Sequence, residues 1–539
     1  MFQVLTISQK ISLVRKGICL FFILLFMYSA KSQNREYNAD LDLLLSELEV
    51  RHPSLYNTTD KSDFIKAINI LKSKTSSLTK NQLLLEIEKI LSLVNDGHTT
   101  LLLFASNEVN YTRLPFKLWK LNEGYVVLST VEKYNILKGK LITHIDRNSI
   151  YDLEQAFKNS FAVENEYGHS VLMQEYVTVP ALLQAKGLIS DTSNIKIIYQ
   201  DLNGKIDSMV IGTILRNEYL RLPFIEENEA VPKWLQNRGK KFWKEFDSQK
   251  NILYIQLNSS DIGGLEAQLR DFSREILEEV KDGKVKKIIL DVRRNFGGSY
   301  IRTRPLFHSL LAINQLNPDI PQYVFIDNYT YSAGAYIAGE LNEHTNALFV
   351  GKPTSGKPQF FGDLHRLKLP HIGITVRYSR LAQVSTNVYD SRPAIMPDLY
   401  ASYSYKDFFY KDPCFELLDI ADKKSLDSGL LFCYQRYGID SLFTYYNLIE
   451  RDSINTYSFN ETTLLSISGH IDSKDRIKLL EFNTSKYPWS WMGFVSLGDA
   501  YMAAGYKNEA EQVYKKAFKI NKYAIQWREL KFNEYLKGK

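Results

Sequence analysis

The chain has 539 residues, which is more than one ordinary domain holds, so we expect two to four domains. Its composition, 45% hydrophobic and 24% charged, is that of a globular protein. The net charge of +6 comes from 67 basic and 61 acidic residues scattered along the chain, which argues against nucleic acid as a partner.

The N-terminus has the pattern of a secretory signal peptide. Basic residues precede the apolar run "GICLFFILLFMYSA", and Ala30 and Ser32 follow the small-residue spacing of a signal-peptidase site. A membrane-spanning helix needs roughly 20 apolar residues, and this run is shorter. We therefore expect residues 1–32 to be removed, with an uncleaved anchor as the alternative. The mature protein would be secreted or periplasmic, without a stable membrane span.

Four segments with different periodicities follow. Apolar residues recur at three- and four-residue steps in residues 33–105, which predicts an N-terminal helical domain. Short strand-like stretches predict a β-rich insert over 106–215. Apolar strands alternate with helices over 216–408, which predicts an α/β core with a mostly parallel sheet covered on both faces. Residues 409–539 are helical again.

The helical C-terminal region contains one stretch with a repeat-like pattern. The segment "SLGDAYMAAGYKNEAEQVYKKAFKIN" has small and aromatic residues at the spacing of a tetratricopeptide repeat, a motif that would suit a protein partner. A generic helical cap on the core is the alternative. The region also holds Cys414 and Cys433, for which one disulfide and two free buried thiols are equally consistent with the sequence.

One serine stands at an apparent strand-to-helix turn. In "DNYTYSAGAYIAGEL", Ser332 follows the apolar run "YVFID" and precedes an apolar helical pattern. Such a turn would expose a nucleophile and direct the amide of Ala333 at a developing oxyanion. The simpler interpretation is that Ser332 caps the following helix. The paired glycines of "IILDVRRNFGGSY" form a second turn after a buried strand, where the amide of Gly298 could face a ligand.

The segment "GKPTSGKPQFFGD" nearly matches a phosphate-binding loop, with Gly351, Gly356 and Lys357 in the expected places. Pro358 follows, however, where the motif needs a magnesium-binding hydroxyl, and no helical pattern comes after it. We therefore expect no bound nucleotide. The sequence also lacks an H-E-x-x-H zinc helix, and we expect no metal or other cofactor. Lys357 could instead act as a base if burial lowered its pKa.

These motifs together resemble those of the tail-specific, or C-terminal processing, serine peptidases and their tricorn-core relatives. The segments "LVNDGHTTLL", "ILDVRRNFGG", "YSAGAYIAGEL" and "LFVGKPTSGK" stand in that family's order over roughly residues 40–405. The resemblance implies a ClpP/crotonase-like protease core with a PDZ-like insert. It also implies Ser332 as nucleophile, and peptides or unfolded proteins as substrates.

The family has two kinds of base, and this sequence offers both. Lys357 stands where the processing branch has its lysine, 25 residues after Ser332, although Phe361 replaces the glutamine usual in that branch. His98, in "DGHT", stands where the tricorn-like branch has its histidine, which needs little pKa tuning near neutral pH. We favour His98 slightly, with Asp390 as a candidate acid to orient its ring.

The sequence therefore predicts an exported serine endopeptidase in which Ser332 attacks the peptide carbonyl. His98 or Lys357 would remove its proton, and the amides near Gly298 and Ala333 would bind the oxyanion. A catalytically inactive scaffold that binds peptides or proteins on the same fold is the alternative. The PDZ-like insert and the tetratricopeptide-like C-terminus would suit that second function.

Overall fold

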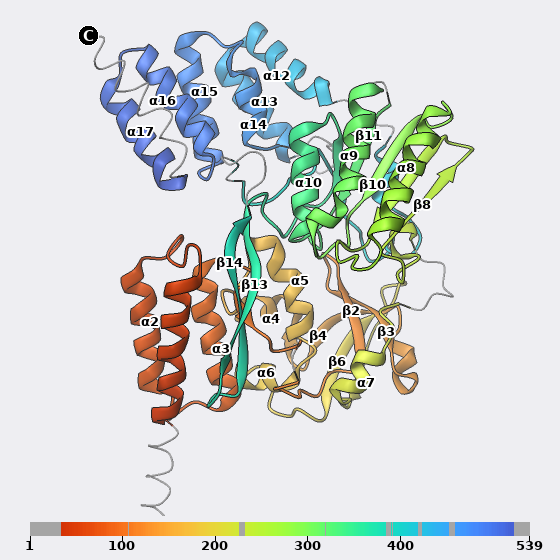
Figure 1. Cartoon of the computed structure of the whole chain (residues 1–539), viewed down its shortest axis with the longest axis vertical. Helices are drawn as coiled ribbons and strands as arrows, with labels where there is room; N and C mark the ends of the chain where they lie inside the picture. Colours follow the sequence, from red (N-terminus) through yellow and green to blue (C-terminus); the bar gives the residue numbers. More distant parts are fainter. Residues whose placement is uncertain are drawn as a thin grey trace, which may run out of the picture.

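The computed structural model describes residues 34–105, 107–225, 232–317, 320–383, 390, 392–418, 423–451 and 459–521. The predicted signal peptide, residues 1–32, lies outside the described residues. Within these ranges, each helix is too short or too polar to span a bilayer. The α/β core and the C-terminal helices occupy one half of the molecule, and the N-terminal helices and the insert occupy the other (Figure 1).

The N-terminal helices pack against a long hairpin that comes from much later in the chain (Figure 1). These helices are residues 34–51, α2 (Lys61–Lys74) and α3 (Lys80–Leu91). The hairpin consists of β13 (Phe360–Leu369) and β14 (Ile374–Gln383), and β1 (Thr100–Leu101) pairs with β14. Buried leucines of the helices share one core with apolar residues of β14. The chain that follows α3 is thereby held beside the chain that follows the core strand β12 (Leu348–Gly351).

The insert is built on a twisted antiparallel sheet with strand order β2-β3-β4-β6-β7. Its strands are β2 (Phe116–Lys120), β3 (Tyr125–Thr130), β4 (Leu141–Ile145), β6 (Ile195–Gln200) and β7 (Ile206–Ile211). Helices α4 (Ile150–Ala156), α5 (Glu166–Tyr176) and α6 (Pro180–Ala185) lie between β4 and β6 in the chain, and α7 (Arg216–Arg221) follows β7. Ser149 begins α4 and Asn165 begins α5, because each side chain accepts a hydrogen bond from a first-turn amide.

The core is a six-stranded sheet in the order β15-β12-β11-β10-β9-β8. Its strands are β8 (Phe242–Asp247), β9 (Ile252–Leu257), β10 (Lys287–Asp291), β11 (Gln322–Ile326), β12 and β15 (Leu399–Tyr400). All neighbouring strands are parallel except β8 and β9. Every residue of β9 and β11 is buried, as expected for central strands of a parallel sheet. The predicted mixed, mostly parallel α/β fold is confirmed.

The two faces of the core sheet are covered differently. Helices α8 (Glu266–Lys281), α9 (Tyr300–Leu316) and α10 (Ala333–His344) bury their apolar sides on one face. The other face packs against residues 401–418, which include the short helix α11 (Pro413–Glu416) and the buried Cys414. The sheet is thus covered on both faces, as predicted, but mostly by helices on one face and by an irregular segment on the other.

From Lys423 onward, the described part of the C-terminal region consists of helices joined by short connections. Its helices are α12 (Lys423–Tyr437), α13 (Ile439–Arg451), α14 (Glu461–Ser468), α15 (Ser473–Lys486), α16 (Trp491–Ala503) and α17 (Lys507–Ile520). The ring of Tyr514 in α17 packs directly on Gly498 in α16, the small–aromatic pairing of the repeat-like segment. Cys414 and Cys433 are both free thiols.

Candidate active site

Ser332 occupies a strained turn between β11 and α10. Its backbone angles are φ 53° and ψ −124°, a conformation that costs a residue with a Cβ about 1–3 kcal/mol. Its side chain makes no capping hydrogen bond to α10. Instead, the Ser332 hydroxyl lies 3.0 Å from Nε2 of His98. The capping interpretation therefore does not describe this serine, and the strain holds a partly exposed hydroxyl against an imidazole.

His98 reaches Ser332 from the turn that follows α3. The ring is 4% exposed and stacks on Tyr331, with 4.8 Å between ring centroids, and on Phe360, at 5.6 Å. Phe360 is the first residue of β13, so the hairpin forms one wall of the imidazole site. With Nε2 at the serine hydroxyl, Nδ1 points away from it and toward a group of polar side chains. The stacked rings leave the imidazole little freedom to turn.

Two carboxylates face Nδ1 of His98. Glu164 Oε1 lies 3.2 Å from Nδ1, Asp96 Oδ1 lies 3.5 Å from it, and the Tyr331 hydroxyl lies 3.0 Å from it. Glu164 is anchored by its other oxygen, which accepts from the backbone N–H of Lys357 at 2.9 Å. Glu164 Oε1 itself has no well-aligned hydrogen-bond donor, which leaves it directed at the ring. Both carboxylates are almost fully buried.

Asp96 is held by donors from three directions. Oδ1 accepts from the N–H of His98 at 2.9 Å, and Oδ2 accepts from the Thr99 hydroxyl at 2.5 Å. Oδ2 also lies 3.2 Å from Nε2 of His52, the residue that follows the helix of residues 34–51. Because the N–H of Ser54 donates to Nδ1 of His52, Nε2 carries the proton and donates to Asp96. The N-terminal helical domain therefore contributes directly to this site.

The electrostatics of the site favour a charged imidazole. Burial alone would lower the pKa of His98, but hydrogen bonds and charges from Asp96 and Glu164 outweigh burial and raise that pKa to about 9. Burial opposes ionisation of Asp96 too, yet its hydrogen bonds from His52, His98 and Thr99 hold its pKa well below the usual range. The arrangement stabilises the imidazolium that forms when a histidine takes a proton from a serine.

Lys357 lies at the acidic side of this group. Burial lowers the pKa of its ammonium, which the charges of Glu164 and Asp96 partly oppose. The side-chain nitrogen of Asn95 donates to the backbone carbonyls of Val163 and Glu164. In that orientation the side-chain oxygen of Asn95 accepts from Lys357 Nζ at 2.9 Å. Among the described residues, the hydrogen-bond partner of the Ser332 hydroxyl is His98 rather than Lys357. Of the two candidate bases, the structure brings His98 into contact with the serine.

The paired glycines pass directly beside Ser332. A Cβ on Gly297 would lie 2.6 Å from Cβ of Ser332, and a Cβ on Gly298 would lie 2.1 Å from the backbone nitrogen of Asp261. Both glycines have positive φ, 108° and 132°, so no other residue fits here without displacing its neighbours. Within the described ranges, the N–H groups of Gly298 and Ala333 donate to no other protein group.

Asn295 fixes this glycine turn to the loop that carries Ser332. Its side-chain oxygen accepts from the N–H of Gly297, and its backbone oxygen accepts from the N–H of Tyr331, each at 3.0 Å. A Cβ on Gly334, in the first turn of α10, would lie 2.3 Å from that backbone oxygen, so α10 approaches as closely as a residue without a side chain allows. The position of Ser332 is thus set by the adjacent turn as well as by its own strand and helix.

Asp390, the predicted orienting acid, does not lie beside the imidazole of His98 in the structure. Its two oxygens instead hold the guanidinium of Arg392 at 2.6 and 2.9 Å. The arginine two residues later in "YDSRP" folds back on the carboxylate and neutralises it. The places beside Nδ1 are occupied by Asp96 and Glu164, neither of which was a sequence candidate.

The same three side chains meet a geometric criterion for metal binding. One ligand atom from each of Asp96, His98 and Glu164 lies within 4.8 Å of the others. Nδ1 of His98 is also within hydrogen-bonding distance of the Tyr331 hydroxyl, and Asp96 already accepts from several donors. These contacts suit a proton-transfer chain that ends at Ser332, and we assign the three residues to that chain.

No family model matches the sequence, and no curated protein matches it. Among solved structures, the chain resembles mature CPAF complexed with lactacystin, with a TM-score of 0.52, 12% identity, and coverage of 72% of this chain and 97% of that chain. Mature CPAF gives a TM-score of 0.51 at 13% identity, covering 72% and 96%. The photosystem II D1 C-terminal processing protease is matched at a TM-score of 0.33 and 14% identity, covering 69% and 93%. At such identities, the likeness to CPAF establishes the fold of the chain.

Proposed function

We propose that the chain is a serine endopeptidase of the tail-specific type that hydrolyses peptide bonds through Ser332 and His98. The observation that carries the proposal is the 3.0 Å contact between the Ser332 hydroxyl and Nε2 of His98, with a carboxylate 3.2 Å from Nδ1. Nucleophile, base and orienting acid in this order are the arrangement that activates a serine for acyl transfer. The strained backbone of Ser332 supports the proposal, because such strain gathers at functional positions.

His98 is the base in this proposal, and Glu164 is its main orienting acid. The Ser332 hydroxyl donates its proton to Nε2 as the oxygen attacks the carbonyl, and Glu164 and Asp96 stabilise the resulting imidazolium. His98 then donates the proton to the leaving amine. The acyl-enzyme is hydrolysed by a water that His98 activates in the same way. Lys357 positions Glu164 through its backbone N–H and offsets part of the negative charge beside the ring.

The oxyanion hole is formed by the N–H groups of Gly298 and Ala333. Neither amide has a protein acceptor in the described part of the chain. Both amides lie close to Ser332 in the chain or in space, because Gly297, the neighbour of Gly298, packs against the Cβ of Ser332, and Ala333 is the residue after Ser332. Ala333 is also the first residue of α10, so the partial positive charge of the helix N-terminus adds to the field at the oxyanion. Removing one such donor typically lowers kcat by about 10²–10³-fold in serine peptidases.

The substrates that fit this proposal are peptides or unfolded proteins, and the proposed location is outside the cytoplasm. The location rests on the signal-like N-terminus, where basic residues precede the apolar run that ends before residue 32. An extracytoplasmic peptidase needs no energy-dependent unfolding if its substrates are already extended. A protein partner at the helical C-terminal region is a further part of the proposal, and it rests on the repeat-like packing of Tyr514 on Gly498.

The test is hydrolysis of casein and of unstructured peptides by the mature protein, with product termini identified by mass spectrometry. We expect cleavage by the parent protein and none by Ser332→Ala. A matched control is Ser299→Ala. Ser299 is next to the glycine turn, and its side chain makes no capping hydrogen bond to α9. If the parent protein leaves all substrates intact, the chain acts as a binding scaffold instead. If Ser332→Ala cleaves them equally well, Ser332 is not the nucleophile.

A further inference from the structure

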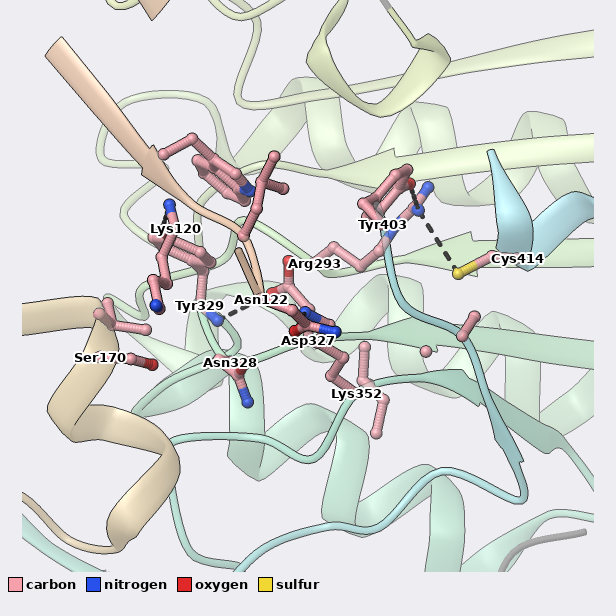
Figure 2. Close-up of a pocket in the computed structure, with 16 residues that line it drawn as sticks. Lys120, Asn122, Ser170, Arg293, Asp327, Asn328, Tyr329, Lys352, Tyr403 and Cys414 are labelled. Atoms are coloured by element: carbon pink, nitrogen blue, oxygen red, sulfur yellow. Dashed lines mark hydrogen bonds between the residues drawn. The ribbon is translucent and has the colours of Figure 1, made fainter. Parts of the chain in front are cut away.

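A cavity of about 90 Å³ lies at the carboxyl ends of β11 and β12, where β2 and α5 of the insert meet the core (Figure 2). A bound water needs roughly 10–15 Å³ of such space, so the cavity has room for about six waters or for a molecule of about six non-hydrogen atoms. Asn122, which lines it, is exposed to solvent, so a small molecule can enter. The carboxyl ends of parallel strands are where α/β sheets usually bind ligands.

Asp327 is directed into this cavity without a cationic partner. Its side chain follows β11 directly, and the residue is only 8% exposed. One carboxyl oxygen accepts from the N–H of Tyr329 at 2.8 Å, and in the described structure the other oxygen has neither a hydrogen-bond donor nor an ion pair. Burial of most of this side chain disfavours its ionised form unless a ligand or water donates to the second oxygen.

Lys352 is directed into the same cavity from the end of β12. Its Nζ lies 3.4 Å from the side-chain oxygen of Asn122, and among the described residues it forms no ion pair with a carboxylate. Figure 2 shows Asp327, Asn122 and Lys352 gathered in the middle of the cavity. Both strands that carry the charged pair are neighbours in the sheet, which fixes the distance between the two side chains.

The other charged groups of the cavity are already neutralised. Lys120 pairs with Glu154 at 3.1 Å. Arg293 lies between Asp291 and Asp412, at 2.6 and 2.8 Å. The two side chains that remain available to a ligand are therefore one acid and one base.

We propose that this cavity binds a small zwitterion of the α-amino-acid class, whose ammonium group pairs with Asp327 and whose carboxylate pairs with Lys352. The apolar part of the ligand would contact Trp119 and Tyr329, whose stacked rings, 3.7 Å apart at their centroids, form one wall. A molecule with a single charge would satisfy only one of the two protein groups and leave the other buried without a partner. L-Alanine, with six non-hydrogen atoms, matches the space.

Binding is expected to release a proton. Burial raises the pKa of Asp327 to about 8, with hydrogen bonding by Tyr329 and the charges of Arg293 and Lys352 opposing it and Asp291 adding to it. Burial lowers the pKa of Lys352, and the charge of Asp327 partly opposes that effect. Lys120 lowers this pKa further, and Glu123 raises it. At neutral pH the empty site therefore holds Asp327 largely protonated. A ligand ammonium favours the carboxylate, so the proton leaves as the ligand enters.

The position of the cavity links it to the proposed active site. Asp327 and Ser332 begin and end the same short loop, and the backbone N–H of Asp327 donates to the Thr330 hydroxyl within that loop at 3.1 Å. A bound zwitterion would hold the first part of the loop that presents the nucleophile. The binding proposal itself does not depend on catalysis.

Calorimetric titration of the mature protein with L-alanine at pH 7, in two buffers with different heats of ionisation, tests the proposal. We expect saturable binding at millimolar ligand, proton release shown by the buffer dependence, and at least about tenfold weaker binding of acetate and of methylamine. Asp327→Asn and Lys352→Met should each weaken L-alanine binding at least about tenfold. Lys406→Met, which removes an exposed lysine that does not line the cavity, should bind as the parent does.

The outcomes against the proposal are equally specific. No heat from L-alanine in the parent protein, equal binding of acetate or methylamine, or unchanged binding in Lys352→Met would each overturn it. Lys352 is partly exposed, so its substitution leaves the fold intact even if Asp327→Asn lowers stability. Since Ser332 takes no part in binding, an inactive enzyme that still binds L-alanine would contradict the proposed function and leave this proposal standing.

Discussion

The charge of Glu164 sets the pH at which Ser332 becomes reactive, and Glu164→Gln tests this directly. The substitution keeps the shape of the side chain and an oxygen that can accept from the N–H of Lys357. It removes a negative charge 3.2 Å from Nδ1 of His98. In the parent protein the His98 pKa of about 9 leaves only about 1% of the ring neutral at pH 7. Reactivity that needs the neutral base should therefore rise about 50-fold between pH 7 and pH 9, where half of the rings are neutral.

The size of the shift follows from the geometry. Two unit charges 3.2 Å apart interact by about 5 kcal/mol at an effective dielectric constant of 20, which sets an upper limit. Desolvation and the amide dipole of the glutamine reduce the effect, and a single neighbouring charge usually shifts a pKa by about 1–3 units. We therefore expect the pKa of His98 to fall by about 1–3 units, while Asp96 continues to raise it. The plateau at high pH should also fall, by about 10–100-fold, because the imidazolium loses a stabilising charge.

The assay is the rate at which a serine-reactive phosphonate labels Ser332 between pH 5 and pH 10, which needs no knowledge of the natural substrate. The expected result is a rate profile in Glu164→Gln whose rising limb lies at lower pH and whose plateau is lower. Glu166→Gln, at an exposed position two residues away, is the matched control and should follow the parent. An unshifted limb in Glu164→Gln would refute the assignment of Glu164 as the orienting acid.

Three further substitutions test other parts of the site. Lys357→Met removes an ammonium that offsets Asp96 and Glu164, so the labelling profile should move to higher pH with its plateau kept; loss at every pH would make Lys357 the base. His52→Phe removes a donor to Asp96 and should slow labelling about 10–100-fold without changing the affinity for the phosphonate. His52→Gln can still donate to Asp96 and should keep most of the parent rate. Equal losses of rate in the two variants would mean that His52 has a purely structural role. In urea unfolding, Ser332→Gly should have a free energy of unfolding about 1 kcal/mol higher than Ser332→Ala. Glycine relieves backbone strain of about 1–3 kcal/mol, and this gain exceeds the loss of about 0.5–1 kcal/mol from its more flexible unfolded chain. An alanine variant of equal or greater stability would contradict the strain at this position.

The parts of the site that the sequence predicted lie in short stretches with their own local signals. The apolar run of β11, the small residues around Ser332 and the helical pattern of α10 all lie within residues 322–344. The turn of Gly297 and Gly298 also has a local signal, because paired glycines follow the apolar run of strand β10. His98 was found because the segment "DGHT" stands in the order typical of the tail-specific family. Local periodicity and motif order were therefore sufficient to predict the core fold and to single out Ser332 and His98, which the structure brings into contact.

The residues that the sequence did not indicate are those whose roles depend on long-range packing. Glu164 lies in the insert, and its anchoring partner is a backbone amide 193 residues later, so no spacing rule points to it. His52 reaches the site because Pro53 ends the preceding helix and turns the chain toward Asp96. Asp96 had a local signal, two residues before His98, that could have been used. Asp390 was a candidate for the orienting acid through motif order alone, and in the structure its carboxylate pairs with the guanidinium of Arg392 instead.

The relation between the C-terminal helices and the core also depends on packing that the sequence does not encode locally. Tyr514 on Gly498 fits a repeat pattern, yet the pattern alone does not say which surface faces the sheet. Similarly, the irregular segment 401–418 covers one face of the core sheet through scattered apolar contacts, without a helical or strand period. Both features were predicted only in outline.

The most direct test of the central claim is the site and rate of phosphonate labelling in the parent protein, in His98→Gln and in Lys357→Met at pH 9. If His98 activates Ser332, mass spectrometry will find the label on Ser332 in the parent and in Lys357→Met, and His98→Gln will react at least about 1,000-fold more slowly. Rapid labelling of Ser332 in His98→Gln, or no label on Ser332 in the parent protein at any pH, would contradict the claim.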